Sequence, residues 1–192
     1  MTQLESEEER MLIVKAKSGD SRAYEVLVRR YQRSIYGLCH RMTGAHQSAD
    51  DLSQETFVKA FFSLSKFREE MSFFAWIRRI AVNSTLNYLK ARKRERPLDE
   101  NHPITAGNPG TRADMPEQRL DHKRLEQTFR EALQTLPADQ RAVFILKVYE
   151  DQSYKDIAET MKIPRGTVMS RLCRARRKLR LALSAFLEGS EA

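Results

Sequence analysis

The sequence has few cysteines and no grouping of metal ligands. Its 192 residues include two cysteines, Cys39 and Cys173, and four histidines. The cysteines lie far apart in the chain and only His40 stands beside either of them, so neither a disulfide nor a zinc site is expected. The other histidines are isolated: His46, His102 and His122. The sequence therefore predicts no metal, no cofactor and a reduced, cytoplasmic setting.

Long apolar runs are also missing. No stretch approaches the roughly 20 apolar residues that span a bilayer. Four of residues 5–9 are glutamate, whereas a signal peptide begins with positive charge. Neither membrane insertion nor a signal peptide is expected. The net charge of +8 instead favours a polyanionic partner, either a nucleic acid or an anionic membrane surface.

Strand signals are equally sparse, which predicts an all-α fold. Only seven glycines interrupt the chain, β-branched runs are rare, and apolar residues recur at steps of three and four. The helices expected in the N-terminal half span residues 11–17, 22–42, 48–64 and 73–94. Those expected in the C-terminal half span about 125–136, 139–149 and, as a pair, 153–183.

Two of these helices have predicted ends and faces. Asp20 or Ser21 is expected to cap the helix that Gly44 stops, and Ser48 with Asp51 is expected to start the next. The buried face of the first is predicted to be Ala23, Val26, Leu27, Tyr31, Ile35, Leu38 and Met42. The buried face of the second is predicted to be Leu52, Phe57, Val58, Phe61, Phe62 and Leu64.

A segment rich in proline and glycine separates the two halves. It contains Pro103, Gly107, Pro109 and Gly110 and too few apolar residues to fix its own shape. The sequence therefore predicts two small helical domains, at 11–96 and 121–187, joined by a flexible linker at 97–120.

The stretch 153–183 predicts a helix-turn-helix. Ser153 and Asp156 have the spacing of a helix-capping pair. Pro164 cannot continue the first helix but suits the opening turn of a second, which leaves a break of about three or four residues. One apolar stripe then runs along the second helix: Val168, Leu172, Ala175, Leu179 and Leu183.

Acidic residues are absent between Lys162 and Arg180, where the second helix carries its cations. These cations are Lys162, Arg165, Arg171, Arg174, Arg176, Arg177, Lys178 and Arg180. Like charges four residues apart repel each other, so a polyanion is the expected partner. The helix also opens with Gly166, Thr167 and Ser170, which suit close approach to bases and phosphates in a major groove. Duplex DNA binding is favoured over a merely solvated basic helix.

Two earlier surfaces remain ambiguous from the residues alone. The acids and amide near the start of the helix at 48–64 are in keeping with a solvated face that complements the helix dipole. The helix at 73–94 alternates aromatic, amide and cationic residues. Its aromatics are expected mainly in the core, whereas its amides and arginines fit a solvated surface and a site for single-stranded nucleic acid equally well.

Six motifs together resemble the bacterial RNA polymerase sigma factors of the sigma-70 family, in the extracytoplasmic-function group (group 4). The first domain carries AYEVLVRRYQ, ADDLSQETFVKAF and FREEMSFFAWIRRIAVN. The second carries LPADQRAVFIL, SYKDIAE and PRGTVMSRLCRARRKL. The resemblance covers residues from about 11 to 185, and it depends on the order of the motifs around the linker.

The resemblance implies three binding surfaces and a division of the chain into sigma region 2 and sigma region 4. Core polymerase would be bound by Asp50, Asp51, Gln54 and Glu55. The melted minus-10 non-template strand would be bound by Lys66, Arg68, Trp76, Arg79, Asn83, Asn87 and Lys90. The minus-35 duplex would be bound by Arg165, Gly166, Thr167, Met169, Ser170, Arg171, Arg174 and Arg177.

The partners implied are core RNA polymerase, promoter DNA and an anti-sigma factor, with no small-molecule substrate. The resemblance also implies a cytoplasmic protein, held at the inner membrane where its anti-sigma factor is membrane-bound. Two departures affect the expected promoter preference. The family often has FRGDS where residues 67–71 read FREEM, and Met169 stands where a lysine or arginine is common.

Two other functions were weighed against a sigma factor. A helix-turn-helix regulator would bind duplex DNA without polymerase, but it leaves the segment from Phe73 to Tyr88 unexplained. A nucleic-acid enzyme such as a recombinase or nuclease needs clustered carboxylates or an activated nucleophile. The acids of this chain lie on helix faces without such a set, so no enzymatic activity is expected.

Overall fold

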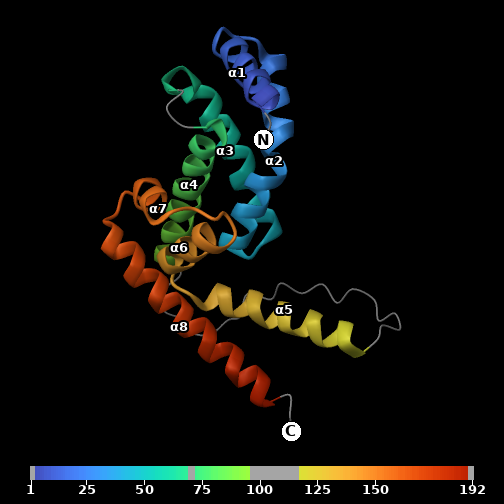
Figure 1. Cartoon of the computed structure of the whole chain (residues 1–192), viewed down its shortest axis with the longest axis vertical. Helices are drawn as coiled ribbons and strands as arrows, with labels where there is room; N and C mark the ends of the chain where they lie inside the picture. The colour runs from blue at the N-terminus through green and yellow to red at the C-terminus, as the bar shows by residue number, and fades with distance from the viewer. Residues whose placement is uncertain (1–2, 69–71, 96–116, 190–192) are drawn as a thin grey trace. The chain divides into compact units, whose positions relative to one another are not determined.

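The computed structural model describes residues 3–68, 72–95 and 117–189, and the regular secondary structure in these ranges is entirely helical (Figure 1). The all-α prediction is confirmed. The N-terminal helices are α1 (Gln3–Lys17), α2 (Ser21–Thr43), α3 (His46–Ser63), the short 3₁₀ helix η1 (Leu64–Lys66) and α4 (Phe73–Glu95). The C-terminal helices are α5 (Glu117–Thr135), α6 (Ala138–Val148), α7 (Tyr154–Met161) and α8 (Arg165–Gly189).

The chain divides into two compact units. The first comprises Met1–His40 and His46–Thr85, and the second comprises Arg41–Ala45 and Leu86–Ala192. The predicted linker at 97–120 lies outside the described residues as far as residue 116, and α5 already begins at Glu117. The boundaries of the two predicted domains stay predictions.

Local signals set the ends of α2. The Asp20 carboxylate accepts hydrogen bonds from the backbone N–H groups of Arg22 and Ala23, at 2.9 and 3.1 Å, which identifies Asp20 as the cap. Gly19 and Gly44, on either side of the helix, both have positive φ, at 98° and 72°. This left-handed conformation favours glycine and ends a helix. The predicted stop at Gly44 is confirmed.

The first unit buries one stripe of each helix. Its fully buried large side chains are Leu27, Ile35 and Leu38 on α2, with Phe73, Ile77 and Val82 on α4. Polar contacts join the helices around this core. Tyr24 on α2 donates to the carbonyl of Phe57 on α3 at 2.6 Å, and Lys59 on α3 donates to Ser84 on α4 at 3.0 Å.

In the second unit, α8 packs against α5, α6 and α7 (Figure 1). Four members of its predicted stripe, Val168, Leu172, Ala175 and Leu179, are at most 3 % exposed, and Leu183 is half-buried. They meet a core that includes Val143, Ile145, Leu146 and Ile157. The predicted helix-turn-helix is present, with Lys162, Ile163 and Pro164 forming the three-residue break between α7 and α8.

Some predicted burial was wrong. Val58, Phe61 and Phe62 on α3 are 54, 45 and 79 % exposed. This helix has two apolar stripes, and only the one containing Leu52 and Phe57 faces the core, which the spacing alone does not reveal. Val26 of α2, which was also predicted to be buried, is 42 % exposed.

The predicted start of α3 was also wrong. The helix begins at His46, so Ser48 lies within its first turn. Asp51 accepts a hydrogen bond from the side chain of Gln47 at 3.2 Å and therefore belongs to the helix surface. Elsewhere, none of the described helices is both long and apolar enough to cross a membrane.

The two cysteines are free thiols in contrasting surroundings. Cys39 is completely buried in the first unit, where its sulfur accepts a hydrogen bond from Thr85 at 3.6 Å. Burial raises the pKa of this thiol to about 11, so at pH 8 roughly a thousandth of it is thiolate. Cys173 lies exposed on α8.

Iodoacetamide at pH 8 is therefore expected to modify Cys173 in the native protein while sparing Cys39, because both burial and the raised pKa suppress the Cys39 thiolate. Intact-protein mass spectrometry would detect one adduct in buffer and two in denaturant. Modification of Cys39 at a rate similar to Cys173 would contradict the packing of the first unit.

Candidate nucleic-acid and protein interfaces

The four residues predicted to bind polymerase lie together on the outer face of α3. Asp50, Asp51, Gln54 and Glu55 are all exposed. Asp50 and Gln54 are four residues apart, as are Asp51 and Glu55, so all four lie on one side of the helix. Neighbouring side chains hold them in place. Gln54 donates to the Asp50 carboxylate at 3.0 Å, and Lys59 pairs with Glu55. The result is an ordered, mainly acidic surface.

The same face continues as an apolar surface towards the C-terminal end of α3. Val58, Phe61 and Phe62 follow Gln54 and Glu55 at helical steps, so they extend the same side of the helix. Phe62 packs edge-on against Phe61, with ring centroids 5.8 Å apart, yet remains 79 % exposed. A large exposed apolar patch beside polar groups is typical of a protein-binding site. We call these seven residues the α3 surface.

The family resemblance predicts only the acidic part of the α3 surface as a binding site. Its apolar part was missed because these residues were predicted to be buried. The available signal was the excess of apolar positions on α3 over what one core-facing stripe requires.

Five of the predicted minus-10 residues form one stripe along α4. Trp76, Arg79, Asn83, Asn87 and Lys90 recur at steps of three, four, four and three, so they share a face. This face is opposite the buried residues Ile77, Ala81 and Thr85. Asn87 and Lys90 are exposed, whereas the other three are half-buried. We call these five residues the α4 stripe.

An aromatic cluster fixes the N-terminal end of the α4 stripe. The Trp76 ring packs against Phe67 and Phe73 at centroid distances of 5.2 and 5.6 Å. Phe67 and Phe73 are almost fully buried. The tryptophan is therefore held by the core, as expected for these aromatics, while part of it faces solvent.

The remaining two minus-10 residues, Lys66 and Arg68, are exposed on either side of Phe67. Further along α4, Asn83 donates its side-chain amide to the carbonyl of Arg79 at 2.8 Å. This bond fixes the orientation of the Asn83 side chain. The departure noted at Glu69, Glu70 and Met71 lies outside the described residues.

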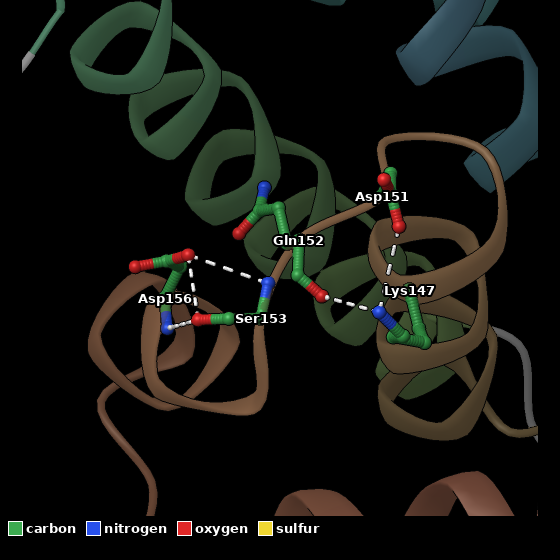
Figure 2. A network of polar contacts seen from close by, with 5 residues as sticks. All are labelled: Lys147, Asp151, Gln152, Ser153 and Asp156. Atoms are coloured by element: carbon green, nitrogen blue, oxygen red, sulfur yellow. Dashed lines mark hydrogen bonds and ion pairs between the residues drawn. The ribbon is translucent and has the colours of Figure 1, made fainter.

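The turn before the helix-turn-helix is held by a network of polar contacts (Figure 2). Lys147, in the last turn of α6, donates to the carbonyl of Gln152 at 3.1 Å and pairs with Asp151 at 3.5 Å. Its ammonium group also lies 5.9 Å from the centre of the Tyr154 ring. Asp151 itself has a positive φ of 45°, a conformation that aspartate tolerates better than most residues. Lys147 thus ties the end of α6 to the start of α7.

The predicted cap of α7 is confirmed and is reciprocal. The backbone N–H of Asp156 donates to Ser153 Oγ at 3.2 Å, and the backbone N–H of Ser153 donates to the Asp156 carboxylate at 3.3 Å (Figure 2). The helix ends at Lys162, in the left-handed conformation. The carbonyl of Pro164 then accepts from Thr167 and Val168, which starts α8. These local features fix the angle at which α8 is presented.

The predicted minus-35 residues lie on the outer half of α8, opposite its buried stripe. Arg165, Gly166, Met169, Ser170, Arg174 and Arg177 are exposed, and Thr167 is half-buried. A Cβ added at Gly166 would meet nothing within 4 Å, so the surface at this position is open. Met169 is 56 % exposed and can contact a thymine methyl group but cannot donate to guanine.

Arg171 differs from the other arginines of α8. Its guanidinium group pairs with Asp139 of α6 at 3.1 Å, and its side chain is only 23 % exposed. This ion pair joins two helices that already pack together. Arg171 therefore supports the placement of α8 in addition to its predicted role at DNA.

Among the described residues, no group of three histidine, cysteine, aspartate or glutamate side chains is placed to hold a metal ion. The exposed surfaces above consist instead of carboxylates, rings, amides and guanidinium groups. Such groups suit the binding of a protein and of nucleic acid.

Known proteins share this arrangement. Residues 27–95 match the family described as Sigma-70 region 2, and residues 126–179 match Sigma-70, region 4. The ECF RNA polymerase sigma-E factor of Haemophilus influenzae is 38 % identical over 170 residues, covering 86 % of this chain and 89 % of that protein. The RNA polymerase sigma-H factor of Pseudomonas aeruginosa is 38 % identical over 192 residues, covering 96 and 98 %. The chain belongs to the extracytoplasmic-function group of the sigma-70 family.

Solved structures also resemble this one. CnrH, in complex with the cytosolic domain of CnrY, gives a TM-score of 0.63 at 25 % identity, covering 93 % of this chain and 98 % of that chain. The sigma factor RpoE in complex with the anti-sigma factor NepR, from Bartonella quintana, gives 0.62 at 26 % identity, covering 84 and 96 %. The family resemblance inferred from the motifs is confirmed. The roles of individual residues in this sigma factor stay predictions.

Arg171 and Arg174 are expected to respond differently to alanine. Arg171→Ala should destabilise the second unit by about 1 kcal/mol, because it removes the closer of the two cations that pair with Asp139 and leaves only Lys90, at 4.0 Å. Arg174→Ala should leave stability unchanged but weaken duplex binding by about 1 to 3 kcal/mol if Arg174 contacts guanine.

Thermal unfolding and fluorescence anisotropy with a minus-35 duplex would separate the two effects. If both variants were equally stable, the ion pair between Arg171 and Asp139 would not contribute to the packing of α8. Unchanged DNA affinity and salt dependence of Arg174→Ala would remove Arg174 from the interface.

Proposed function

We propose that this sigma factor binds core RNA polymerase and directs initiation at promoters that carry particular minus-35 and minus-10 sequences. The observation that carries the proposal is the presence of three exposed surfaces of different chemistry on separate helices. Each of these surfaces lies within residues that match a sigma region. The α3 surface and the α4 stripe lie in region 2, and the outer face of α8 lies in region 4.

The α3 surface is the proposed polymerase-binding site. Its polar half, with Asp51 and Glu55, would recognise basic side chains on the polymerase and speed encounter. Its apolar half, led by Phe62, would supply the buried anchor, since interface binding energy concentrates in a few aromatic residues. Polymerase binding therefore depends on both halves.

The α4 stripe, with Lys66 and Arg68, is proposed to bind the unpaired non-template strand of the minus-10 element. Bases that leave the duplex expose a ring face and a Watson–Crick edge. Trp76 offers a partly exposed ring for stacking, Asn83 offers an amide for base edges, and Arg79 and Lys90 offer charge for phosphates. This set suits one strand better than a duplex.

The outer face of α8 is proposed to read the minus-35 duplex from the major groove. Its arginines would contact phosphates or guanine, and Met169 favours a thymine nearby. Because a methionine stands at this position, the preferred sequence is expected to differ from that of relatives with a cation there. Sequence would thus be read once in paired DNA and once in unpaired DNA.

The energetics favour capture of the open strand. Opening promoter DNA costs on the order of 1.4 kcal/mol per base-pair step. Stacking captured bases returns about 1 to 3 kcal/mol each. Each captured base therefore offsets roughly one or two opened base-pair steps, so binding energy can contribute to opening without nucleotide hydrolysis.

An anti-sigma factor is the proposed regulator. CnrH and RpoE, the two solved relatives above, are each seen in complex with a partner, CnrY and the anti-sigma factor NepR respectively. The α3 surface, with its large exposed rings, would be available to such a partner when polymerase is absent. A cytoplasmic location follows from this function. If the anti-sigma factor is anchored in the inner membrane, it would hold the sigma factor at that membrane.

The central test is transcription in vitro on genomic DNA with core polymerase, with and without this protein. We expect transcripts from defined start sites only when both are present, and mapping those starts yields the two promoter elements. Duplex binding without any polymerase-dependent initiation would favour the plain helix-turn-helix regulator.

Phe62→Ala is expected to weaken polymerase binding about tenfold or more, because aromatic anchors at interface centres contribute about 2 kcal/mol or more. Met11→Ala, which also removes a large exposed apolar side chain, is the matched control and should bind normally. Surface plasmon resonance on immobilised core polymerase measures both. Equal affinity of the two variants for core polymerase would show that the apolar half of the α3 surface does not contribute to binding.

Asn83→Ala is expected to reduce open-complex formation while minus-35 duplex binding is retained, because the change removes one base-edge contact from region 2. Permanganate footprinting measures the opening, and anisotropy measures the duplex affinity. Loss of both activities together would indicate a folding defect, and loss of neither would remove Asn83 from strand capture.

A further inference from the structure

Helix α1 lies before the residues that match Sigma-70 region 2, which begin at residue 27. It nevertheless contacts two places next to the proposed strand-binding residues, through Lys17 at its C-terminal end and Glu9 near its middle.

Lys17 holds the segment that follows η1. Its ammonium group donates to the backbone carbonyl of Phe67 at 2.7 Å, and the same group lies 5.3 Å from the centre of the Phe67 ring. The two contacts fix both the backbone and the side chain of Phe67. Since Lys66 and Arg68 flank Phe67 directly, their backbone positions depend on this anchor.

Glu9 acts on the first turn of α4 through Tyr31. The Glu9 carboxylate is only 5 % exposed and accepts a hydrogen bond from the Tyr31 hydroxyl. The Tyr31 ring stacks on Phe74, with centroids 5.2 Å apart and planes 18° from parallel. It also contacts Phe73 at 5.9 Å.

Charge and protonation support the Glu9 contact. Arg30 of α2 pairs with Glu8 at 2.8 Å and lies 3.7 Å from Glu9, which compensates the buried carboxylate. Burial, followed by the hydrogen bond to Glu9, raises the pKa of the Tyr31 hydroxyl. The hydroxyl therefore remains a donor throughout the physiological pH range.

The two anchors converge on one aromatic cluster. Phe67, held by Lys17, contacts Phe73 and Trp76 at 5.7 and 5.2 Å. Phe73, held by Tyr31, also contacts Trp76. Trp76 is the first member of the α4 stripe, so α1 supports its position from two directions.

We propose that α1 is a brace for strand capture, in which Lys17 and Glu9 are positioning residues that hold Lys66, Arg68 and Trp76 in the geometry that binds the unpaired strand. The inference depends on the proposed function of the α4 stripe. It adds a requirement for a helix outside the matched region, acting on the minus-10 element and not on the duplex.

The test uses the full-length protein bound to core polymerase and a fluorescein-labelled single-stranded DNA carrying the minus-10 non-template sequence found by transcript mapping. Lys17→Met removes the donor and keeps an apolar stem of similar length, whereas Lys17→Arg keeps a charged donor. Lys15→Met is the charge-matched control, because Lys15 is an exposed lysine two residues away on the same helix. Tyr31→Phe removes only the hydroxyl group that donates a hydrogen bond to Glu9.

Lys17→Met is expected to weaken strand binding about tenfold, the loss corresponding to one hydrogen bond from a charged donor. Lys17→Arg should restore affinity to within about threefold of the original, and Tyr31→Phe should cost about threefold. Lys15→Met should leave strand binding unchanged. Affinities for core polymerase and for the minus-35 duplex should stay constant in all four variants.

Wild-type strand affinity in Lys17→Met and Tyr31→Phe would overturn the brace while leaving the proposed function intact. A parallel loss of polymerase affinity would overturn it as well, because α1 would then support the unit as a whole. Equal losses of strand affinity in Lys17→Met and Lys15→Met would show that the effect comes from net charge, and this result would also overturn the brace. Failure of the unaltered protein to bind the strand would instead refute the proposed function, and the brace with it.

Discussion

The structure depends on one constraint, which is that each amphipathic helix can bury only one of its sides. In α3, α4 and α8 the buried stripe, formed by residues such as Leu52, Ile77 and Val168, determines which side chains remain outside. Burying these stripes supplies most of the driving force for folding. The opposite sides are therefore free to differ in chemistry, with acids and rings on α3, amides and cations on α4, and arginines on α8.

This separation explains how small helical units can perform several binding tasks without an enclosed site. Polymerase needs a surface with an apolar anchor, an unpaired strand needs rings and amides, and a duplex needs a helix that fits a groove. In the proposed function, each requirement is met by one helix side. The surfaces do not compete for the same residues, so one can change while the others are retained.

How far the sequence predicts this arrangement depends on whether the information is local. The capping pair Ser153 and Asp156, the break at Pro164 and the stripe on α8 all depend on residues close together in the chain, and all three were predicted correctly. The members of the α4 stripe were named instead by the family resemblance, and the structure shows that they share one side of the helix. Family resemblance then assigned functions to these elements that spacing alone left open.

The features that could not be predicted depend on packing between helices. Two apolar stripes on α3 are equally good candidates for the core, and only the neighbouring helices decide that Phe57 is buried and Phe62 exposed. Lys17 and Phe67 are 50 residues apart, so no local pattern connects them. The ion pair between Arg171 and Asp139 likewise needs the contact of α6 with α8.

The charge of α8 shows how stability and function are linked in this sigma factor. Between Lys162 and Arg180 the sequence offers no acid, so neighbouring cations repel one another in the free protein. Asp139, supplied by α6, pairs with Arg171, whereas Arg174 and Arg177 are exposed. In the proposed function, a duplex would replace this repulsion with attraction to phosphates and release counterions. Because a ligand that binds only the folded state stabilises it, the cations that repel one another in the free second unit would be the ones through which promoter DNA stabilises it.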